Sequence, residues 1–261
     1  MRQLISVIAF FLSIWGGTAL AQVPDPAPWD RLLQRYVQTS SDGLNRVDYA
    51  AWAASPADRT ALDGYIASLA ATRPSQMARA DAFAYWANLY NAATIKVVLG
   101  AYPVASIRDI PSRGVLINPL GGPWKMNVVT VEGRAMSLDD IEHGTMRPTF
   151  RDPRVHYSVN CASVGCPNLQ REAFRGERLE AQLDAAARAY INSPRGVRVG
   201  PRGMTLSNIY QWFRADFGSE AELRAHLARY AQGPLAQQIR SSPIAGYAYD
   251  WALNETPRRT R

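Results

Sequence analysis

Residues 81–100 constrain the fold most, because their pattern predicts a long helix that is apolar on nearly every side. Asp81 is suited to cap its start, and Gly100 stands shortly before Pro103, where a helix would stop. Large aromatic side chains lie inside the segment, at Tyr85, Trp86 and Tyr90. A helix that is hydrophobic all round is buried rather than placed on a surface. We therefore expect a core helix here.

Two asparagines on this helix are unusual for a buried element. Asn88 and Asn91 share one helical face with Ala84, Ala92 and Ile95. A buried amide without partners costs about 1–3 kcal/mol, so both should be hydrogen-bonded. Either they hold the backbone of a neighbouring loop, or they orient a catalytic imidazole or bind a substrate carbonyl.

The remaining pattern is mostly helical, with few strands. Further helices are expected at 29–37, 57–71, 137–143, 179–191, 207–217 and 219–230, and strands at 128–131, 154–160 and 244–251. Ser137 and Ser219 each open a capping-box pattern. The chain is 47% hydrophobic and 20% charged, which is enough apolar material for a real core. We predict an α+β fold in a single domain, mostly helical with a small sheet covered by helices.

The first residues have the pattern of a signal peptide, residues 1–21. Arg2 precedes the apolar run 4–15, and Ala19 and Ala21 form a small-residue cleavage site before Gln22. The run is too short for a stable anchor, so no membrane span is expected after cleavage, although an uncleaved anchor is the alternative. The expected location is periplasmic or secreted. Residues 22–46 would form a lead-in and helix, 47–254 the main domain, and 255–261 a basic tail.

The net charge of +7 comes almost entirely from arginine. The arginines are scattered among acidic residues, as on an ordinary solvated surface, although attraction to an anionic envelope is the alternative interpretation. Export argues against nucleic acid as the partner. The expected partner is therefore an unknown small molecule, peptide or glycan of the envelope.

Residues 151–167 carry both cysteines and His156. The predicted strand delivers Cys161 to a turn of small residues that ends at Cys166. A Cys161–Cys166 disulfide is the default for an exported protein, and their α-carbons should then lie within about 7 Å. Alternatively Cys161 is a thiolate nucleophile. A metal site with both thiolates and a histidine is a third option, but it lacks a CxxC pair, so we expect no metal and no cofactor.

A catalytic site would need an imidazole near Cys161. In a strand, His156 and Cys161 face opposite sides, which weakens a direct pair. His143, at the end of the helix that begins at Ser137, could serve instead, or could only complement the helix dipole. We predict that His143, His156, Asn160 and Cys161 converge with Asn88 or Asn91 in one pocket. His226 is expected at the surface.

Four blocks of the sequence occur in a characteristic order: YWANLYNA (85–92), SLDDIEH (137–143), DPRVHYSVNCASVGCP (152–167) and YDWALN (249–254). With these blocks the chain resembles the family called domain of unknown function 547, DUF547, over residues 47–254, which is nearly the whole mature chain. The resemblance implies a domain and no established activity.

Two function classes remain. One is a thiol-dependent hydrolase or acyl transferase of the cell envelope, with Cys161 as nucleophile, His143 or His156 as base, and amides of Asn88, Asn91 or Asn160 as donors. The other is a non-catalytic binding domain for a peptide or glycan, stapled by the disulfide. The sequence does not decide whether the protein is an enzyme.

Overall fold

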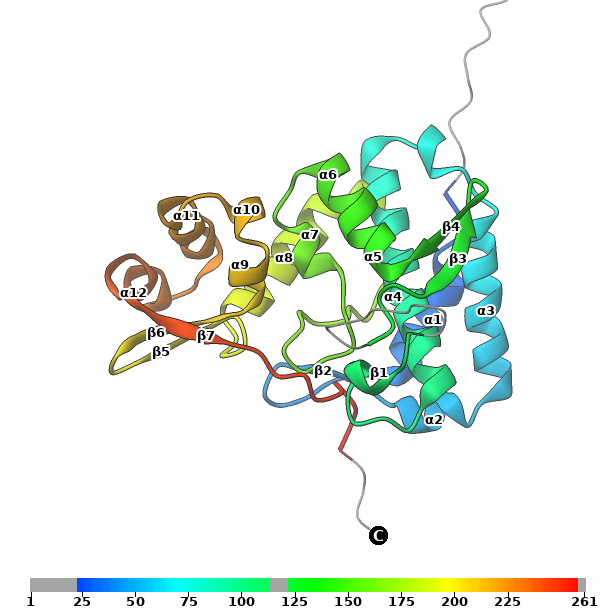
Figure 1. Ribbon diagram of the computed structural model, residues 1–261, viewed down its shortest axis with the longest axis horizontal. Helices are drawn as coiled ribbons and strands as arrows, with labels where there is room; N and C mark the ends of the chain where they lie inside the picture. The colour runs from blue at the N-terminus through cyan, green and yellow to red at the C-terminus, as the bar shows by residue number, and fades with distance from the viewer. Residues whose placement is uncertain (1–22, 113–121, 258–261) are drawn as a thin grey trace, which may run out of the picture.

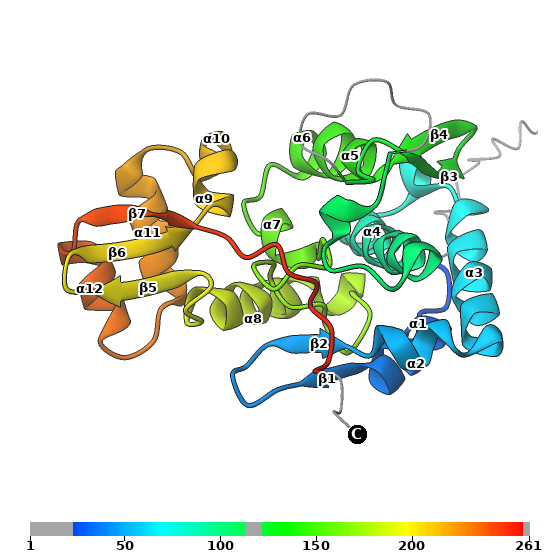
Figure 2. The same cartoon turned by 60° about the horizontal axis from the view of Figure 1, so that its bottom comes forward.

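Helix α4 (Arg79–Ala101) runs through the centre of the larger part of the fold (Figures 1 and 2). The computed structural model describes residues 23–112 and 122–257. Between Phe83 and Leu99, all residues of α4 except Lys96 are buried. The expected core helix is therefore confirmed.

The architecture is α+β and mostly helical, as predicted. The helices around α4 are α1 (Ala27–Tyr36), α2 (Tyr49–Ala53), α3 (Pro56–Ala70), α5 (Leu138–Ile141), α6 (Arg147–Phe150) and α7 (Val155–Ser158). The later helices are α8 (Leu179–Ile191), α9 (Ile209–Trp212), α10 (Arg214–Phe217), α11 (Glu220–Tyr230) and α12 (Leu235–Ser241). Short turns of other helix types are η1 (Pro74–Gln76), η2 (Ile107–Asp109), η3 (Glu142–Met146) and η4 (Gly176–Arg178).

The strands are divided among three small sheets. Two are antiparallel pairs, β1 (Val37–Thr39) with β2 (Asn45–Val47) and β3 (Asn127–Val131) with β4 (Arg134–Ser137). The third has the order β5 (Val197–Gly200), β6 (Gly203–Ser207), β7 (Ile244–Ala248), with β6 and β7 parallel. None of the helices formed by residues 23–112 and 122–257 is long and apolar enough to cross a membrane.

The buried side chains form two hydrophobic clusters. The main cluster surrounds α4, and the second cluster fills the space between the β5–β6–β7 sheet and helices α9 to α12. Helix α8 belongs to both, because Leu179 and Leu183 pack into the main cluster while Tyr190 and Ile191 pack into the second. This shared helix joins the two clusters.

Residues 154–160 are not the expected strand. Val155–Ser158 is the single helical turn α7, and Val159, which follows it, is extended. The backbone N–H of Val155 donates to the carbonyl of Asp152, and this hydrogen bond closes a turn that contains Pro153 and leads into α7. All four residues of α7 are buried, so apolar alternation carried no information about a face.

Both predicted capping boxes are present, at Ser137 and Ser219. The helix that begins after Ser137 then changes at Glu142 into the π-helical turn η3, before continuing as α6. The single helix expected at 207–217 is interrupted at Phe213, between α9 and α10.

After β7 the chain returns to the larger part of the fold and lies beside β2 (Figure 2). On the way, the carbonyls of Asp250 and Ala252 accept hydrogen bonds from Gly165 and Val164. The predicted signal peptide lies outside the described residues, as do residues 258–261 of the predicted basic tail.

Candidate functional site

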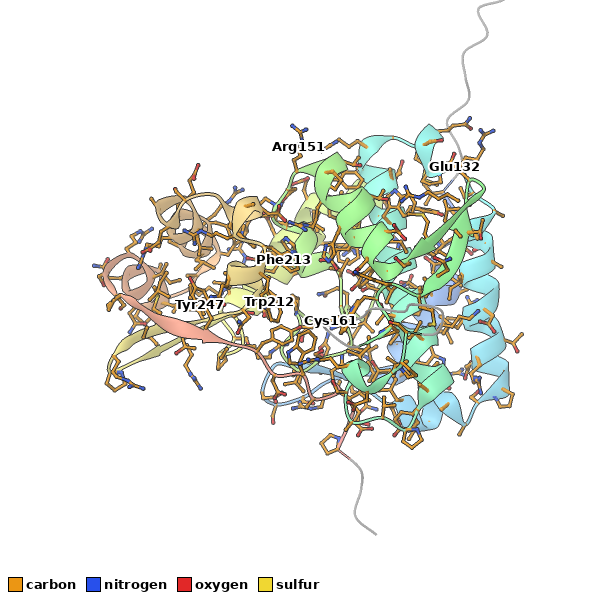
Figure 3. All side chains as sticks on the ribbon, in the orientation of Figure 1. Glu132, Arg151, Cys161, Trp212, Phe213 and Tyr247 are labelled. Atoms are coloured by element: carbon orange, nitrogen blue, oxygen red, sulfur yellow. A yellow bond between two sulfur atoms is a disulfide. The ribbon has the colours of Figure 1, made fainter. Side chains whose placement is uncertain are left out.

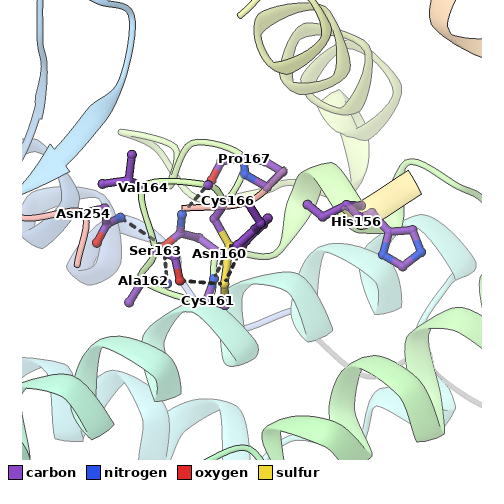
Figure 4. The surroundings of a disulfide bond; sticks show 12 residues. His156, Asn160, Cys161, Ala162, Ser163, Val164, Cys166, Pro167 and Asn254 are labelled. Atoms are coloured by element: carbon purple, nitrogen blue, oxygen red, sulfur yellow. Dashed lines mark hydrogen bonds between the residues drawn. A yellow bond between two sulfur atoms is a disulfide. The ribbon is translucent and has the colours of Figure 1, made fainter. Parts of the chain in front are cut away.

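The two cysteines form a disulfide, and their α-carbons lie 6.2 Å apart (Figure 4). The predicted pairing is confirmed. The two residues differ in exposure: Cys161 is half-buried, whereas Cys166 is only 4% exposed.

The loop that carries the disulfide is held tightly by its neighbours. Ala162 has a φ of 62°, a left-handed conformation that is uncommon for a residue with a Cβ. At Gly165 a Cβ would lie 2.8 Å from the backbone nitrogen of Asp250, so only glycine fits there. Arg195 donates to the carbonyls of Val164 and Cys166. These contacts hold the backbone of the loop in place, and with it the two cysteines.

Tyr249 is placed directly over the disulfide. Its hydroxyl oxygen lies 3.1 Å from Cys161 Sγ and 3.1 Å from Cys166 Sγ. Burial raises the pKa of Tyr249 well above its usual range, so the hydroxyl stays protonated and acts as a donor. The backbone N–H of Cys161 also donates to Cys166 Sγ, at 2.9 Å.

A cavity of about 470 Å³ lies beside the disulfide, at the junction of the two hydrophobic clusters. Its walls come from both sides, since Val159 belongs to the main cluster and Ile209 to the second. Figure 3 shows Trp212, Phe213 and Cys161 at this junction. Other lining residues are Tyr90, Arg108, Trp124, Lys125, Asp139, Glu142, His143, His156, Cys166, Pro167, Tyr249 and Trp251.

One wall of the cavity is aromatic. The ring of Trp251 lies 5.7 Å from Trp124, 5.6 Å from Trp212 and 4.6 Å from Tyr249, measured between centroids. Trp212 is 45% exposed and, with Val23, is one of the large exposed hydrophobic residues of the described chain. The partly exposed ring of Trp212 therefore gives the cavity lining an apolar surface that solvent can reach.

The other wall is ionisable and centred on His156. Its Nε2 lies 2.7 Å from Oδ2 of Asp216, and its Nδ1 lies 3.5 Å from Oε1 of Glu142. On the other side of Asp216, Arg147 donates two hydrogen bonds to the carboxylate, from Nε to Oδ2 at 2.6 Å and from Nη2 to Oδ1 at 3.1 Å. Glu142, His156, Asp216 and Arg147 thus follow one another in a row. The ring of Phe213 stacks on the imidazole at 4.3 Å. Glu142 lies in the π-helical turn, an element that occurs frequently at functional sites.

The pKa values show which of these groups are charged. Burial alone would lower the pKa of His156, but hydrogen bonds to Asp216 and Glu142 raise it above the usual value. Burial would raise the pKa of Glu142 and of Asp216, but their interactions with His156, together with those of His143 and Tyr90 at Glu142 and of Arg147 at Asp216, lower both pKa values. This wall therefore carries alternating charges, with Glu142 and His156 buried and Asp216 and Arg147 partly exposed.

His143 lies at the open side of the row, with 35% of its side chain exposed. Its Nδ1 is 3.8 Å from Glu142 and its Nε2 is 3.9 Å from Asp139. Burial raises the pKa of Asp139. Because His143 is accessible from the cavity, it is the imidazole best placed to touch a ligand.

Cys161, His143 and His156 line one cavity, whereas Asn160, Asn88 and Asn91, which were predicted to join them, are not among its lining residues. The Cys161 sulfur nevertheless contacts the hydroxyls of Ser163 and Tyr249. The imidazole of His156 instead contacts the carboxylates of Glu142 and Asp216. The cavity brings the thiol and imidazole residues together without a direct hydrogen bond between them.

The three predicted asparagines act on backbone instead. Asn88 holds both the N–H and the carbonyl of Phe174, at 2.9 Å each. Asn91 donates to the carbonyl of Ser158 and accepts from the N–H of Asn160. The amide of Asn160 donates to the carbonyl of Pro167 and accepts from the N–H of Ala162. Of the two interpretations, loop clamping describes their contacts.

Sequence reasoning gave no role to Asp216, Arg147 or Tyr249. The first two lie on helices with ordinary charged surfaces, so no local signal marks them. His226 was expected at the surface, but its Nε2 lies 2.9 Å from the Tyr157 hydroxyl, and burial lowers its pKa to about 4. Among residues 23–112 and 122–257, no cluster of three or more His, Cys, Asp or Glu side chains could hold a metal ion.

Residues 74–191 match the family described as protein of unknown function, DUF547, so this part of the chain is a DUF547 domain. The match contains Glu142, His143, His156 and both cysteines, whereas Trp212, Asp216 and Tyr249 lie beyond it. The comparisons with curated proteins and with solved structures gave no match.

Proposed function

We propose that this protein is an exported, disulfide-stapled binding domain that takes a peptide or glycan of the cell envelope in the cavity described above. The observation that carries the proposal is Trp212, a 45% exposed ring stacked on Trp251 at the cavity wall. Ligand sites are mostly apolar and aromatic, with a few polar groups that fix orientation. Here Asp139 and His143 supply such polar groups.

The closed disulfide favours binding over thiol catalysis. A cysteine nucleophile acts as a thiolate, and Cys161 is bonded to Cys166. The bond lies in the cavity wall, where it fixes the loop beneath Tyr249. In this state the loop contributes shape rather than a nucleophile.

The test is a binding screen with envelope oligosaccharides and short peptides, read by tryptophan fluorescence. Trp212→Ala should weaken binding at least tenfold. Because the ring also packs against Tyr249 and Trp251, affinity is compared at a temperature at which circular dichroism shows both variants to be folded. Tyr247→Ala is the matched control, since this half-buried aromatic residue lies on β7 and does not line the cavity. Equal affinity in both variants, or no ligand in either class, would reject the proposal.

A thiol-dependent hydrolase or acyl transferase is the second candidate. It is supported by the placement of Cys161, His143 and His156 in one cavity. In the reduced protein, Cys161 should then turn over a model ester such as p-nitrophenyl acetate, and Cys161→Ser should abolish turnover while Cys166→Ser retains it. Absence of turnover by the reduced protein would eliminate this candidate.

Export is the third element of the proposal, with a periplasmic or secreted location. Its support is the signal-like segment 1–21, together with a disulfide, which persists in oxidising compartments. N-terminal sequencing of the mature protein should begin at Gln22. A mature protein that retains Arg2 would contradict cleavage.

A further inference from the structure

We infer that the Cys161–Cys166 disulfide is an exchangeable redox pair, in which an incoming thiol attacks Cys161 and Cys166 leaves as the thiolate. This activity goes beyond ligand binding and does not depend on which peptide or glycan the cavity takes. It also needs no acyl-enzyme intermediate, which separates it from the hydrolase candidate.

The first argument is access. Both cysteines line the cavity, but Cys161 is half-buried and Cys166 is 4% exposed. The cavity, at about 470 Å³, has room for a small thiol such as glutathione to enter beside Cys161. Thiol–disulfide exchange depends on which sulfur can be reached, so attack is directed to Cys161.

The second argument is the leaving group. Cys166 Sγ accepts a hydrogen bond from the backbone N–H of Cys161 at 2.9 Å and lies 3.1 Å from the Tyr249 hydroxyl. Hydrogen bonds to the charged form of a group stabilise that form, and a thiol with a more stable thiolate leaves faster. The Tyr249 hydroxyl can serve either sulfur, and the Ser163 hydroxyl lies 3.4 Å from Cys161 Sγ. The shortest contact, at 2.9 Å from the backbone N–H of Cys161, is made to Cys166 Sγ. The pair is therefore polarised toward departure of Cys166.

The third argument is that these donors are already in place. Gly165 approaches Asp250 so closely that a Cβ would clash, and its N–H donates to the Asp250 carbonyl at 2.8 Å. This contact ties the cysteine loop to the residue that follows Tyr249. The hydroxyl therefore remains over the sulfurs without a rearrangement when the bond breaks.

The exchange balances with a low-molecular-weight thiol, RSH, as the reductant. A thiolate RS⁻ forms a bond to Cys161 Sγ, the Cys161–Cys166 bond breaks, and its electron pair stays on Cys166 Sγ, which then takes a proton from water. A second RS⁻ attacks the RS sulfur of the mixed disulfide and releases the Cys161 thiolate. The net reaction converts two RSH into RSSR and the protein disulfide into a dithiol, and the reverse reaction reoxidises the protein.

The experiment uses the folded, oxidised protein and reduced glutathione. After acid quenching, peptide mapping by mass spectrometry should place the glutathione adduct on Cys161. Tyr249→Phe should slow adduct formation roughly fivefold, the effect of losing one hydrogen bond. Phenylalanine retains the ring that packs against Trp212 and Trp251. Tyr247→Phe, which removes a hydroxyl away from the sulfurs, should leave the rate unchanged.

Three results would overturn the inference: an adduct mainly on Cys166, an unchanged rate in Tyr249→Phe, or reaction only under unfolding conditions. Near-ultraviolet circular dichroism of each variant shows whether it is folded. If Tyr249→Phe does not fold, the position of the adduct on the wild-type protein decides the question alone. Failure of the ligand screen leaves all of these outcomes unaffected.

Discussion

Asp216 on α10 accepts a hydrogen bond from His156 on α7 at 2.7 Å, and this contact lies between residues of the two hydrophobic clusters, beside the cavity that His156 lines. His156 stacks on Phe213 of the second cluster, while Arg147 holds Asp216 from the side of the main cluster. The ion pairs of Asp216 with His156 and Arg147 therefore also hold the two parts of the fold together.

The first prediction concerns the pH dependence of stability. The raised pKa of His156 means that its contribution is fully present below the unfolded pKa of about 6.5 and is lost as the pH rises through the folded pKa. The lowered pKa of Asp216 means that its contribution is present above the unfolded value of about 3.9 and is lost as the pH falls. Urea unfolding should therefore show the largest combined contribution between about pH 4 and 6.5. From pH 5.5 to 9, wild type should lose more stability than His156→Gln; parallel curves would contradict the assignment.

The second prediction concerns Asp216 itself. Asp216→Asn removes the charge that pairs with His156 and Arg147, so the free energy of unfolding should fall by about 1.5–3 kcal/mol, the range for hydrogen bonds to charged groups. Asp63→Asn is the control, because its 2.8 Å pair with Lys96 is solvent-exposed. Exposed pairs contribute at most about 1 kcal/mol. Similar losses of unfolding free energy in both variants, measured at pH 6, would show that the ion pairs of Asp216 contribute little to stability.

A third prediction concerns the asparagines of α4. Replacing Asn88 or Asn91 by alanine leaves buried backbone groups of residues 158, 160 or 174 without partners, at a cost of about 1–3 kcal/mol each. Asn127→Ala, at an exposed position of β3, should change stability by less than about 0.5 kcal/mol. Thermal melts of the three variants provide the comparison. Unchanged melting of both α4 variants would mean that the clamps contribute nothing.

The fourth prediction compares two glycines. Gly165→Ala places a Cβ 2.8 Å from the Asp250 nitrogen, so the strand-like contact between the cysteine loop and residues 249–254 must shift. Overpacking of this kind costs about 1–3 kcal/mol. Gly64→Ala should instead stabilise by about 0.5–1 kcal/mol, because Gly64 lies in α3 with no atom near its Cβ position. Opposite shifts of the denaturation midpoint are expected, and a stabilised Gly165→Ala protein would contradict the close approach.

Elements with strong local signals were predictable from the sequence. The apolar pattern of 81–100, the capping boxes at Ser137 and Ser219, and the amphipathic segment 179–191 each became a helix near the expected bounds. The disulfide was predictable because only four residues lie between the two cysteines, in a chain with a signal-like start. These features depend on neighbours in the sequence.

Features that depend on tertiary contacts were not predictable. The turn α7 was expected as a strand, because three alternating apolar residues are compatible with either structure when all sides are buried. The partners of His156 come from positions 142 and 216, which no local pattern relates. Tyr249 reaches the disulfide only because the chain returns from β7, a path that depends on the whole fold.

This return path also determines when the site can form. Tyr249 and Trp251 are made after every other residue of the cavity wall, the last of which before them is Phe213. While the ribosome still holds residues 249–254, the cysteine loop lacks its backbone partners at 250, 252 and 254, and the wall is open on that side. The cysteines can pair earlier, but the donor from Tyr249 arrives later. The cavity wall therefore cannot be completed before residues 249–254 have been synthesised and have reached the cysteine loop.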